Sequence, residues 1–338
     1  MPFLTASLLD TLRRFPTPRR YVVAYSGGCD SHSLLHALVQ IREQLDCQNL
    51  LAIHVDHGLQ TESSQWSGHC EKICQQYAVP FQLIALKLVT PKGESPEAYA
   101  RQARYAAMQD DLDYDDMLLL AQHQDDQAET LLLQLLRGSG VRGLAAMPEI
   151  NRSDRYWQAR PWLHIGRTEI QSYAEQAQLN WIDDPSNQDN RFDRNYLRNE
   201  IMPLLKQRWP AAAETLGRTA RHQAEASELV NTLAELDWRE CRLNEKTMLS
   251  LPQLKRLTAA RQRNLLRYWI AEQCDLPLPD SIHCQRIIEE VLPAAQDAEP
   301  VVSWGDIAVR RYRDVLHIEK CLSTAPAEWR QQWDLQAP

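Results

Sequence analysis

The sequence predicts an α/β protein, in which a parallel sheet carries helices on both faces and a smaller, mainly helical domain follows. Two observations support this class. Short segments rich in β-branched and aromatic residues alternate with amphipathic segments up to about residue 136, which is the pattern of strand–helix–strand units. After about residue 210, apolar residues recur mostly at helical spacing. A chain of 338 residues is long enough for two domains with cores of their own.

Strands and helices are predicted to alternate in the first part of the chain. The strands are expected at residues 20–25, 49–55, 81–88 and 117–121. The helices are expected at residues 31–44, 62–78, 96–111 and 125–136. Because ligands of such sheets bind at the carboxyl ends of the strands, the residues that follow each strand are candidates for a site.

The second part of the chain is predicted to be mostly helical. Helices are expected at residues 167–178, 195–205, 210–242, 251–273 and 280–292, and a strand pair within residues 301–319. We place the domain boundary near the start of the long helix. This division gives a first domain at residues 1–215, a second at residues 216–322 and a tail or linker at residues 323–338.

A glycine turn joins the first predicted strand to the first helix. Its residues are Ser26, Gly27, Gly28, Cys29, Asp30 and Ser31. Glycines let backbone N–H groups turn toward a phosphate, and the start of a helix favours negative charge. The turn is not a Walker A loop, because no Gly-Lys-Ser/Thr follows the glycines. The alternative is a tight strand–helix turn that binds nothing.

A second polar cluster follows the second predicted strand and contains His54, Asp56 and His57. The absence of a nearby Cys-x-x-Cys in the sequence argues against a zinc site. Asp56 is a candidate to contact an adenosine, with a polar strand end as the alternative. Cys70 and Cys74 have the wrong spacing for ordinary zinc or iron–sulfur loops.

A third cluster follows the fourth predicted strand and contains His123, Asp126 and Glu129. The two carboxylates are three residues apart, so they share a face of the predicted helix. Such a pair can hold a metal ion or an amine. Acidic residues are also favoured at any helix start, which is the alternative interpretation.

Two groups of arginines are candidates to bind anions. Arg101 and Arg104 are one helical turn apart and could grip a carboxylate or a phosphate, unless Arg101 only pairs with Glu97 on a solvated face. A second group could reach the phosphates of ATP or RNA and consists of Arg191, Arg194 and Arg198.

Composition narrows the class of protein. The formal net charge of −8 argues against a generally basic nucleic-acid binder, although residues 137–222 are net basic. That basic region fits either an RNA footprint or a solvated face. The eight scattered cysteines favour reduced thiols in the cytoplasm, and neither a signal peptide nor a membrane-spanning segment is predicted.

Taken together, these motifs resemble the tRNA(Ile)-lysidine synthetases, a family of PP-loop ATP pyrophosphatases. Residues 26–31 resemble the PP-loop, Ser-Gly-Gly-x-Asp-Ser. Residues 54–59 and 121–130 resemble the motifs after the second and fourth strands, and Arg194-Asn-x-x-Arg198 resembles a later one. The match covers about residues 20–205. Residues 215–320 are similar to the tRNA-contacting domain of the family.

The resemblance implies a PP-loop, Rossmann-like fold and a defined reaction. ATP adenylates the wobble cytidine of the CAU anticodon of tRNA(Ile), and L-lysine then displaces AMP to give lysidine, which changes decoding from AUG to AUA. The implied cofactors are ATP and Mg²⁺, and the implied domains are catalytic (1–215) and tRNA-binding (216–322). The longer family members carry a further C-terminal domain, to which residues 323–338 would lead. The resemblance leaves open whether the protein forms a homodimer.

The resemblance also implies roles for individual residues. The turn from Ser26 to Ser31, together with Asp56, is expected to bind the nucleotide, and Asp30 to bind Mg²⁺. Asp126 and Glu129 are expected to grip the amines of lysine. Arg101, Arg104 and Arg198 are candidates for its carboxylate or for the α-phosphate, and His123 or a carboxylate for accepting a proton.

Two alternatives belong to other functional classes. A PP-loop tRNA thiolase would be expected to carry cysteines placed for an iron–sulfur cluster or a persulfide. A non-catalytic tRNA-binding protein would release no pyrophosphate from ATP in the presence of lysine and tRNA.

Overall fold

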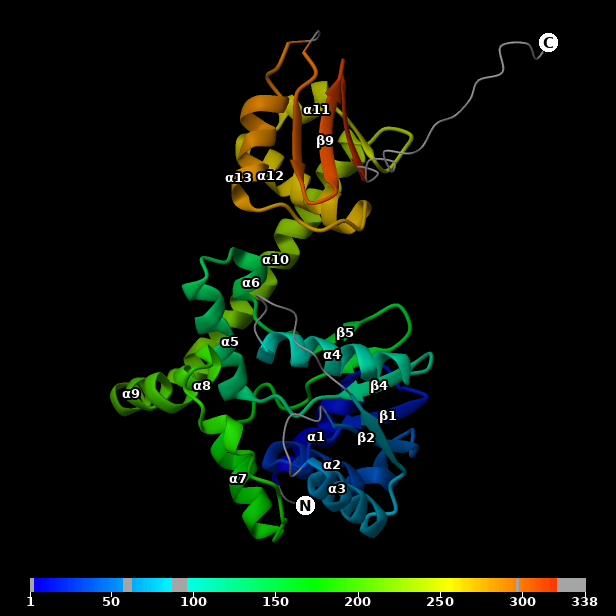
Figure 1. Cartoon of the computed structure of the whole chain (residues 1–338), viewed down its shortest axis with the longest axis vertical. Helices are drawn as coiled ribbons and strands as arrows, with labels where there is room; N and C mark the ends of the chain where they lie inside the picture. Colours follow the sequence, from blue (N-terminus) through cyan, green and yellow to red (C-terminus); the bar gives the residue numbers. More distant parts are fainter. Residues whose placement is uncertain (1–2, 57–62, 87–95, 296–297, 321–338) are drawn as a thin grey trace, which may run out of the picture. The chain divides into compact units, whose positions relative to one another are not determined.

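The computed structural model describes residues 3–56, 63–86, 96–295 and 298–320. Its internal contacts divide the chain into two compact units, residues 1–225 and residues 226–338. Helix α10 (Ala212–Cys241) begins in the first unit and ends in the second (Figure 1). No helix within the described ranges is long and apolar enough to cross a membrane.

A six-stranded sheet forms the centre of the first unit, in the order β3-β2-β1-β4-β6-β5. β1 pairs in parallel with both β2 and β4, which confirms the predicted parallel sheet. At one edge β5 and β6 form an antiparallel pair that was not predicted. The strands are β1 (Arg20–Ala24), β2 (Leu50–Asp56), β3 (Phe81–Ala85), β4 (Asp116–Leu119), β5 (Ile150–Arg152) and β6 (Trp157–Ala159).

Both faces of this sheet are covered by helices, as predicted. Alternate residues of β1 point to opposite faces: Tyr21 and Val23 join one hydrophobic cluster, and Val22 joins another. The larger cluster is formed with α1 (Phe3–Arg14), α2 (Cys29–Ile41), α3 (Ser63–Gln76) and α7 (Arg167–Gln176). The smaller cluster is formed with α4 (Pro96–Asp110). Helix α1 was not predicted from the sequence.

The remaining helices of the first unit lie after β4. They are α5 (Gln124–Leu136), α6 (Val141–Leu144), α8 (Asp193–Tyr196) and α9 (Met202–Arg208), with a π-helical turn at Leu197–Ile201 and a 3₁₀ turn at Pro185–Gln188. A further 3₁₀ turn at Arg42–Gln44 follows α2. The chain moves outward from β1 to β3 and then returns to the other side of β1 with β4. Ligands of open α/β sheets bind at such a switch point, beyond the carboxyl ends of the strands.

The second unit packs a small antiparallel sheet against helices. The strands β7 (Met248–Ser250), β8 (Val301–Trp304), β9 (Ile307–Tyr312) and β10 (Val315–Lys320) are ordered β7-β10-β9-β8. The helices are α11 (Leu251–Arg256), α12 (Ala259–Tyr268) and α13 (Ser281–Arg286), with π-helical turns at Trp269–Gln273 and Ile287–Val291. The fully buried Trp269 is part of its core. A strand pair was expected here, and the structure has four strands.

A neutral histidine is buried under the turn that follows β1. His32 is fully buried on α2, and its Nε2 lies 3.2 Å from the hydroxyl of Tyr77. Burial, together with the nearby His69, lowers the pKa of His32 from 6.5 to about 4. The folded protein therefore excludes a proton that the unfolded chain binds below pH 6.5.

We expect the free energy of unfolding to fall as the pH drops from 6.5 to about 4, by up to about 3 kcal/mol from His32. Its contribution is fully present above pH 6.5 and is lost as the pH falls toward the folded pKa. Urea unfolding at several pH values measures this slope. His32→Phe should flatten it, while the exposed His222→Gln should leave it unchanged. A slope that His32→Phe does not alter would exclude this origin.

Candidate active site

A cavity of about 800 Å³ lies at the carboxyl ends of β1, β2 and β4. The turn after β1, the end of β2 and the residues after β4 contribute to its lining, as do several residues between 182 and 195. The structure therefore brings together residues that the sequence placed in three separate clusters. The charged and polar side chains that line the cavity include Ser26, Asp30, Asp56, Arg104, Asp126 and Arg191.

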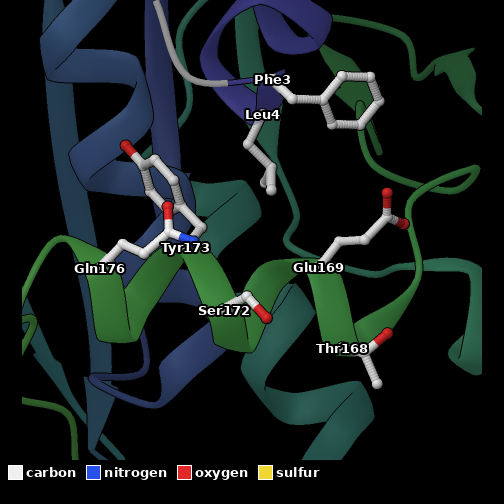
Figure 2. Close-up of a pocket in the computed structure, with 7 residues that line it drawn as sticks. All are labelled: Phe3, Leu4, Thr168, Glu169, Ser172, Tyr173 and Gln176. Carbon is white, nitrogen blue, oxygen red and sulfur yellow. The ribbon is translucent and has the colours of Figure 1, made fainter.

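A smaller and more open hollow lies between α1 and α7 (Figure 2). Its volume is about 280 Å³, and Phe3 and Tyr173 line it. The one carboxylate in its lining, Glu169, accepts a hydrogen bond from the backbone N–H of Gly166 at 2.8 Å and so caps α7. This hollow has no cluster of reactive groups, and the chemistry of the described residues is concentrated in the larger cavity.

The turn after β1 is held in shape by its two serines. The backbone N–H of Ser26 donates to Oγ of Ser31 at 3.2 Å, and this hydroxyl lies 3.1 Å from the carbonyl oxygen of Gly28, to which it donates. Gly28 is the N-cap of α2 and offers no side-chain acceptor to the first turn of the helix. The helix start is therefore suited to an anion supplied by a ligand.

Gly27 is wedged between two side chains. Its φ is +83°, a conformation that L side chains rarely adopt. A Cβ atom at this position would lie 2.8 Å from Sγ of Cys70 and 2.8 Å from Cδ1 of Ile182. The backbone N–H of Ile182 also donates to the carbonyl oxygen of Gly27 at 3.0 Å. Glycine is therefore required here both by backbone conformation and by space.

His123 connects the turn to the acidic cluster. It is the N-cap of α5, and its backbone N–H donates to Oδ2 of Asp126 at 3.0 Å. Nε2 of its ring lies 3.4 Å from the same oxygen and 3.6 Å from Oδ2 of Asp30. Burial acts to lower the pKa of His123, but the carboxylates of Asp126, Asp30 and Asp125 outweigh it and raise the pKa.

Asp126 and Glu129 form a buried ion cluster with two arginines. Arg198 donates from Nη2 to Oδ1 of Asp126 at 2.7 Å and from Nε to Oε1 of Glu129 at 2.7 Å. Arg194 donates to the same two carboxylates at 3.1 Å and 2.9 Å. Although burial acts to raise the pKa of Asp126, His123 and both arginines lower it to about 2. Asp126 therefore stays ionised.

The other predicted site residues lie in different surroundings. Cys29 begins α2 and is half-buried, and burial together with Asp30 raises the pKa of its thiol to about 11. Arg101 is on α4, but its side chain lies outside the described residues, as does His57. Cys70 and Cys74 are buried in the core under the sheet, and the described residues contain no group of three potential metal ligands.

Asp30 has an oxygen that fits a cation. Its Oδ1 is shielded from solvent and accepts no hydrogen bond from the described residues, while Asp30 itself lines the cavity. A carboxylate oxygen is a preferred ligand of Mg²⁺. Oδ1 of Asp30, beside the turn after β1, is therefore compatible with one ligand bond to a magnesium ion.

Sequence reasoning missed several residues that shape this site. Ile182 was not singled out, because an isolated apolar residue in a turn-rich stretch carries no pattern. Arg194 was predicted to reach phosphates and was not recognised as a partner of Asp126 and Glu129. Arg194 and Arg198 are four residues apart and the two carboxylates are three apart, so each pair shares one face of a helix, and this signal could have predicted the cluster.

Comparison with known proteins agrees with the fold and shows the family. Residues 4–205 match the family described as the PP-loop domain, and residues 249–317 match the TilS substrate binding domain. The U34-tRNA thiolase NcsA from Methanococcus maripaludis has a similar fold, with a TM-score of 0.54 and 18% identity over 65% of this chain and 78% of that chain. The first unit is therefore a PP-loop domain, the class that uses ATP.

Three relatives define the family further. The tRNA(Ile)-lysidine synthase of Pseudomonas syringae pv. tomato is 44% identical over 97% of this chain and 73% of the relative. Those of Coxiella burnetii and Methylococcus capsulatus are 40% and 43% identical over 98% of this chain and 73% and 75% of the relatives. The chain belongs to the tRNA(Ile)-lysidine synthase family.

Gly27→Ala should remove ATP binding without unfolding the protein. The new Cβ would collide with Cys70 and Ile182 at a backbone angle that alanine disfavours, so the turn has to move. We expect an affinity for ATP at least 100-fold lower in isothermal titration calorimetry. Gly68→Ala is the matched control, because a Cβ at this position on α3 meets nothing within 4 Å. Wild-type affinity in Gly27→Ala would contradict the structural requirement.

Arg198→Lys should destabilise the first unit. Lysine keeps the charge but cannot reproduce the forked hydrogen bonds to Asp126 and Glu129, which remain paired with Arg194. The loss of charge-assisted hydrogen bonds costs about 2 kcal/mol. Arg286→Lys is the control, since Arg286 makes a similar two-bond pair with Glu290 on an exposed helix surface. There we expect a much smaller change, because solvent screens an exposed pair. Urea unfolding measures the free energy of unfolding of both variants. If both lose the same amount, the charge cluster around Arg198 is not buried.

Proposed function

We propose that the protein ligates L-lysine to the wobble cytidine of the CAU anticodon of tRNA(Ile), with cleavage of ATP to AMP and pyrophosphate. The supporting observation is that one cavity joins a phosphate-type turn to a buried, ionised carboxylate cluster, in a chain of this family. The thiolase alternative is not favoured, because the similar relatives are synthases and Cys70 and Cys74 are buried in the core.

In the first step the nucleotide is held at the turn after β1. Backbone N–H groups at the start of α2 bind the phosphates that leave, and Asp56 contacts the adenosine. Asp30 would hold Mg²⁺, which neutralises charge that builds on the departing pyrophosphate. The ring carbonyl oxygen of the cytidine attacks the α-phosphorus, pyrophosphate leaves, and the cytidine becomes adenylated. Arg104 on the cavity wall, together with Arg101, is suited to the α-phosphate.

In the second step the ε-amine of lysine attacks the activated ring carbon, and AMP leaves with the former carbonyl oxygen. Asp126 lines the cavity and is the carboxylate that can contact the amine. Glu129 is almost fully buried and holds Arg194 and Arg198 against Asp126. Because Asp126 stays ionised, it attracts and orients the amine, and the proton that the amine loses passes to solvent. Arg198 is the candidate for the carboxylate of lysine.

His123 acts as a positioning residue in this scheme. His123 is buried and contacts both Asp126 and Asp30. It is not one of the described residues that line the cavity. Its contacts with both carboxylates keep the phosphate turn and the amine subsite at a fixed separation. A base must also leave the anticodon stack to reach this cavity, as modification of a base generally requires.

The second unit is proposed to bind the tRNA. Residues 249–317 match a substrate binding domain, and exposed basic side chains on α11 and α12 are suited to the phosphate backbone. These side chains include Lys255, Arg256 and Arg267. We propose that the catalytic part spans residues 1–215 and the tRNA-binding part residues 216–322. A cytoplasmic location and a homodimer both stay predictions.

The proposal is tested by incubating the protein with ATP, Mg²⁺, radiolabelled lysine and a tRNA(Ile) transcript. We expect acid-precipitable label with the CAU anticodon and none when the wobble cytidine is replaced by uridine. Equal labelling of both transcripts, or none of either with a folded protein, would reject the function. Pyrophosphate release that requires tRNA but not lysine would support the order of the two steps.

Asp126→Asn should abolish lysine transfer while the protein stays folded. The amide keeps the shape of the side chain but loses the charge that attracts the amine, so we expect at least a 100-fold lower rate of label incorporation. Asp115→Asn is a control, because Asp115 pairs with Arg152 at the surface, beside the start of β4. A normal transfer rate in Asp126→Asn would remove this residue from the mechanism.

A further inference from the structure

One segment of the first unit touches both halves of the cavity. It runs from Ile182, which contacts the phosphate turn, to Arg198, which pairs with Asp126 and Glu129. Between these ends it contributes Asp184, Ser186, Asn187, Asp189 and Arg191 to the cavity wall. We refer to residues 182–198 as the strap.

The first end of the strap is fixed to the backbone of the phosphate turn. Ile182 donates its N–H to the carbonyl oxygen of Gly27 at 3.0 Å, and its Cδ1 lies against the same residue. Sγ of Cys70 also lies close to Gly27. The serine hydrogen bonds within the turn involve Ser26, Gly28 and Ser31, so Ile182 supplies the bond that reaches Gly27 from outside. A phosphate that shifts Gly27 must therefore also shift Ile182.

The middle of the strap is stiffened by its own side chains. Asp184 accepts a hydrogen bond from the backbone N–H of Ser186 at 2.9 Å. Nδ2 of Asn195 donates to the carbonyl oxygens of Ser186 and Asp189 at 2.8 Å and 3.0 Å. Nδ2 of Asn199, just beyond the strap, donates to the carbonyl oxygen of Asn187 at 3.1 Å. These bonds tie the loop to the helical stretch that carries the arginines, so a displacement at one end reaches the other.

The second end of the strap is held by hydrogen bonds to two buried carboxylates, which would be broken if it moved. Arg194 and Arg198 together make five side-chain hydrogen bonds to Asp126 and Glu129, of 2.7–3.1 Å. The position of these guanidinium groups determines which acceptor sites of Asp126 remain for an amine. The strap therefore connects the backbone of the phosphate turn to the charges around the amine subsite.

We propose that Ile182 is a positioning residue through which occupation of the phosphate turn orders the strap and sets the arginines at the amine subsite. The inference rests on the proposed function for the identity of the two ligands. It adds a physical link between the two subsites, so that the amine subsite takes its final arrangement when the turn holds phosphates.

Hydrogen–deuterium exchange with Mg²⁺ and inorganic pyrophosphate tests this link. Pyrophosphate carries the phosphates that the turn is proposed to hold but lacks the adenosine, which could touch the strap directly. In the wild-type protein we expect exchange to slow at least fivefold both in residues 26–35 and in residues 184–198. In Ile182→Ala we expect residues 26–35 to remain protected and protection of residues 184–198 to fall below twofold.

A matched pair of smaller changes keeps the test decisive if Ile182→Ala folds poorly. Ile182→Val and Ile170→Val each remove one methyl group from the same hydrophobic cluster, but Ile170 lies on α7 and its side chain is fully buried there. We expect weaker protection of the strap in Ile182→Val and wild-type protection in Ile170→Val. Equal protection in wild type and both Ile182 variants would overturn the proposal.

An assay of lysidine formation on the same wild-type sample distinguishes a failure of the link through Ile182 from a failure of the proposed function. If lysidine forms and pyrophosphate protects the turn but not the strap, the link through Ile182 is wrong and the function stands. If neither the turn nor the strap is protected, the phosphate-binding role of the turn and the link both fail. If both segments are protected but no lysidine forms, the link stands and the function fails.

Discussion

Two buried carboxylates and the two half-buried arginines that neutralise them hold two helical segments of the first unit together. Asp126 and Glu129 project from α5, and Arg194 and Arg198 project from the helical stretch at residues 193–208. An unpaired charge of either sign would be strongly disfavoured in this place, so the two helical segments are stable only together. Their pairing draws the residues between 182 and 192 over the cavity. One side of the cavity is thus held in place by an electrostatic contact between segments about 65 residues apart in the chain.

The local part of the site could be predicted from the sequence. The strand at residues 20–25, the glycine turn and the helix after it are each defined by neighbouring residues, through β-branched content, glycine spacing and helical periodicity. For the same reason Asp126 and Glu129 could be placed on one helix face. The partners of these groups could not be predicted in this way, because Arg194, Ile182 and Cys70 reach the site only through the tertiary fold.

Elements at the edges of the sheets were harder to predict than those at the centre. β5 and β6 have three residues each, too few for a periodic pattern, and they are stabilised mainly by pairing with each other and with β4. β7 precedes α11 directly and is a strand because it pairs with β10, some 65 residues away. Helix α1 has an amphipathic pattern, but its leucines are buried only because they pack against α2 and α7 in the folded protein.

The thiol of Cys29 in the turn after β1 differs in reactivity from that of an ordinary cysteine. Cysteine reacts with oxidants and electrophiles as the thiolate, and burial beside Asp30 keeps Cys29 protonated at neutral pH. A negatively charged sulfur would repel the phosphates of an incoming nucleotide, whereas the neutral thiol does not. With its pKa raised to about 11, a smaller fraction of Cys29 is thiolate at neutral pH than of an unperturbed cysteine, so its reaction with peroxides and disulfides is expected to be slower.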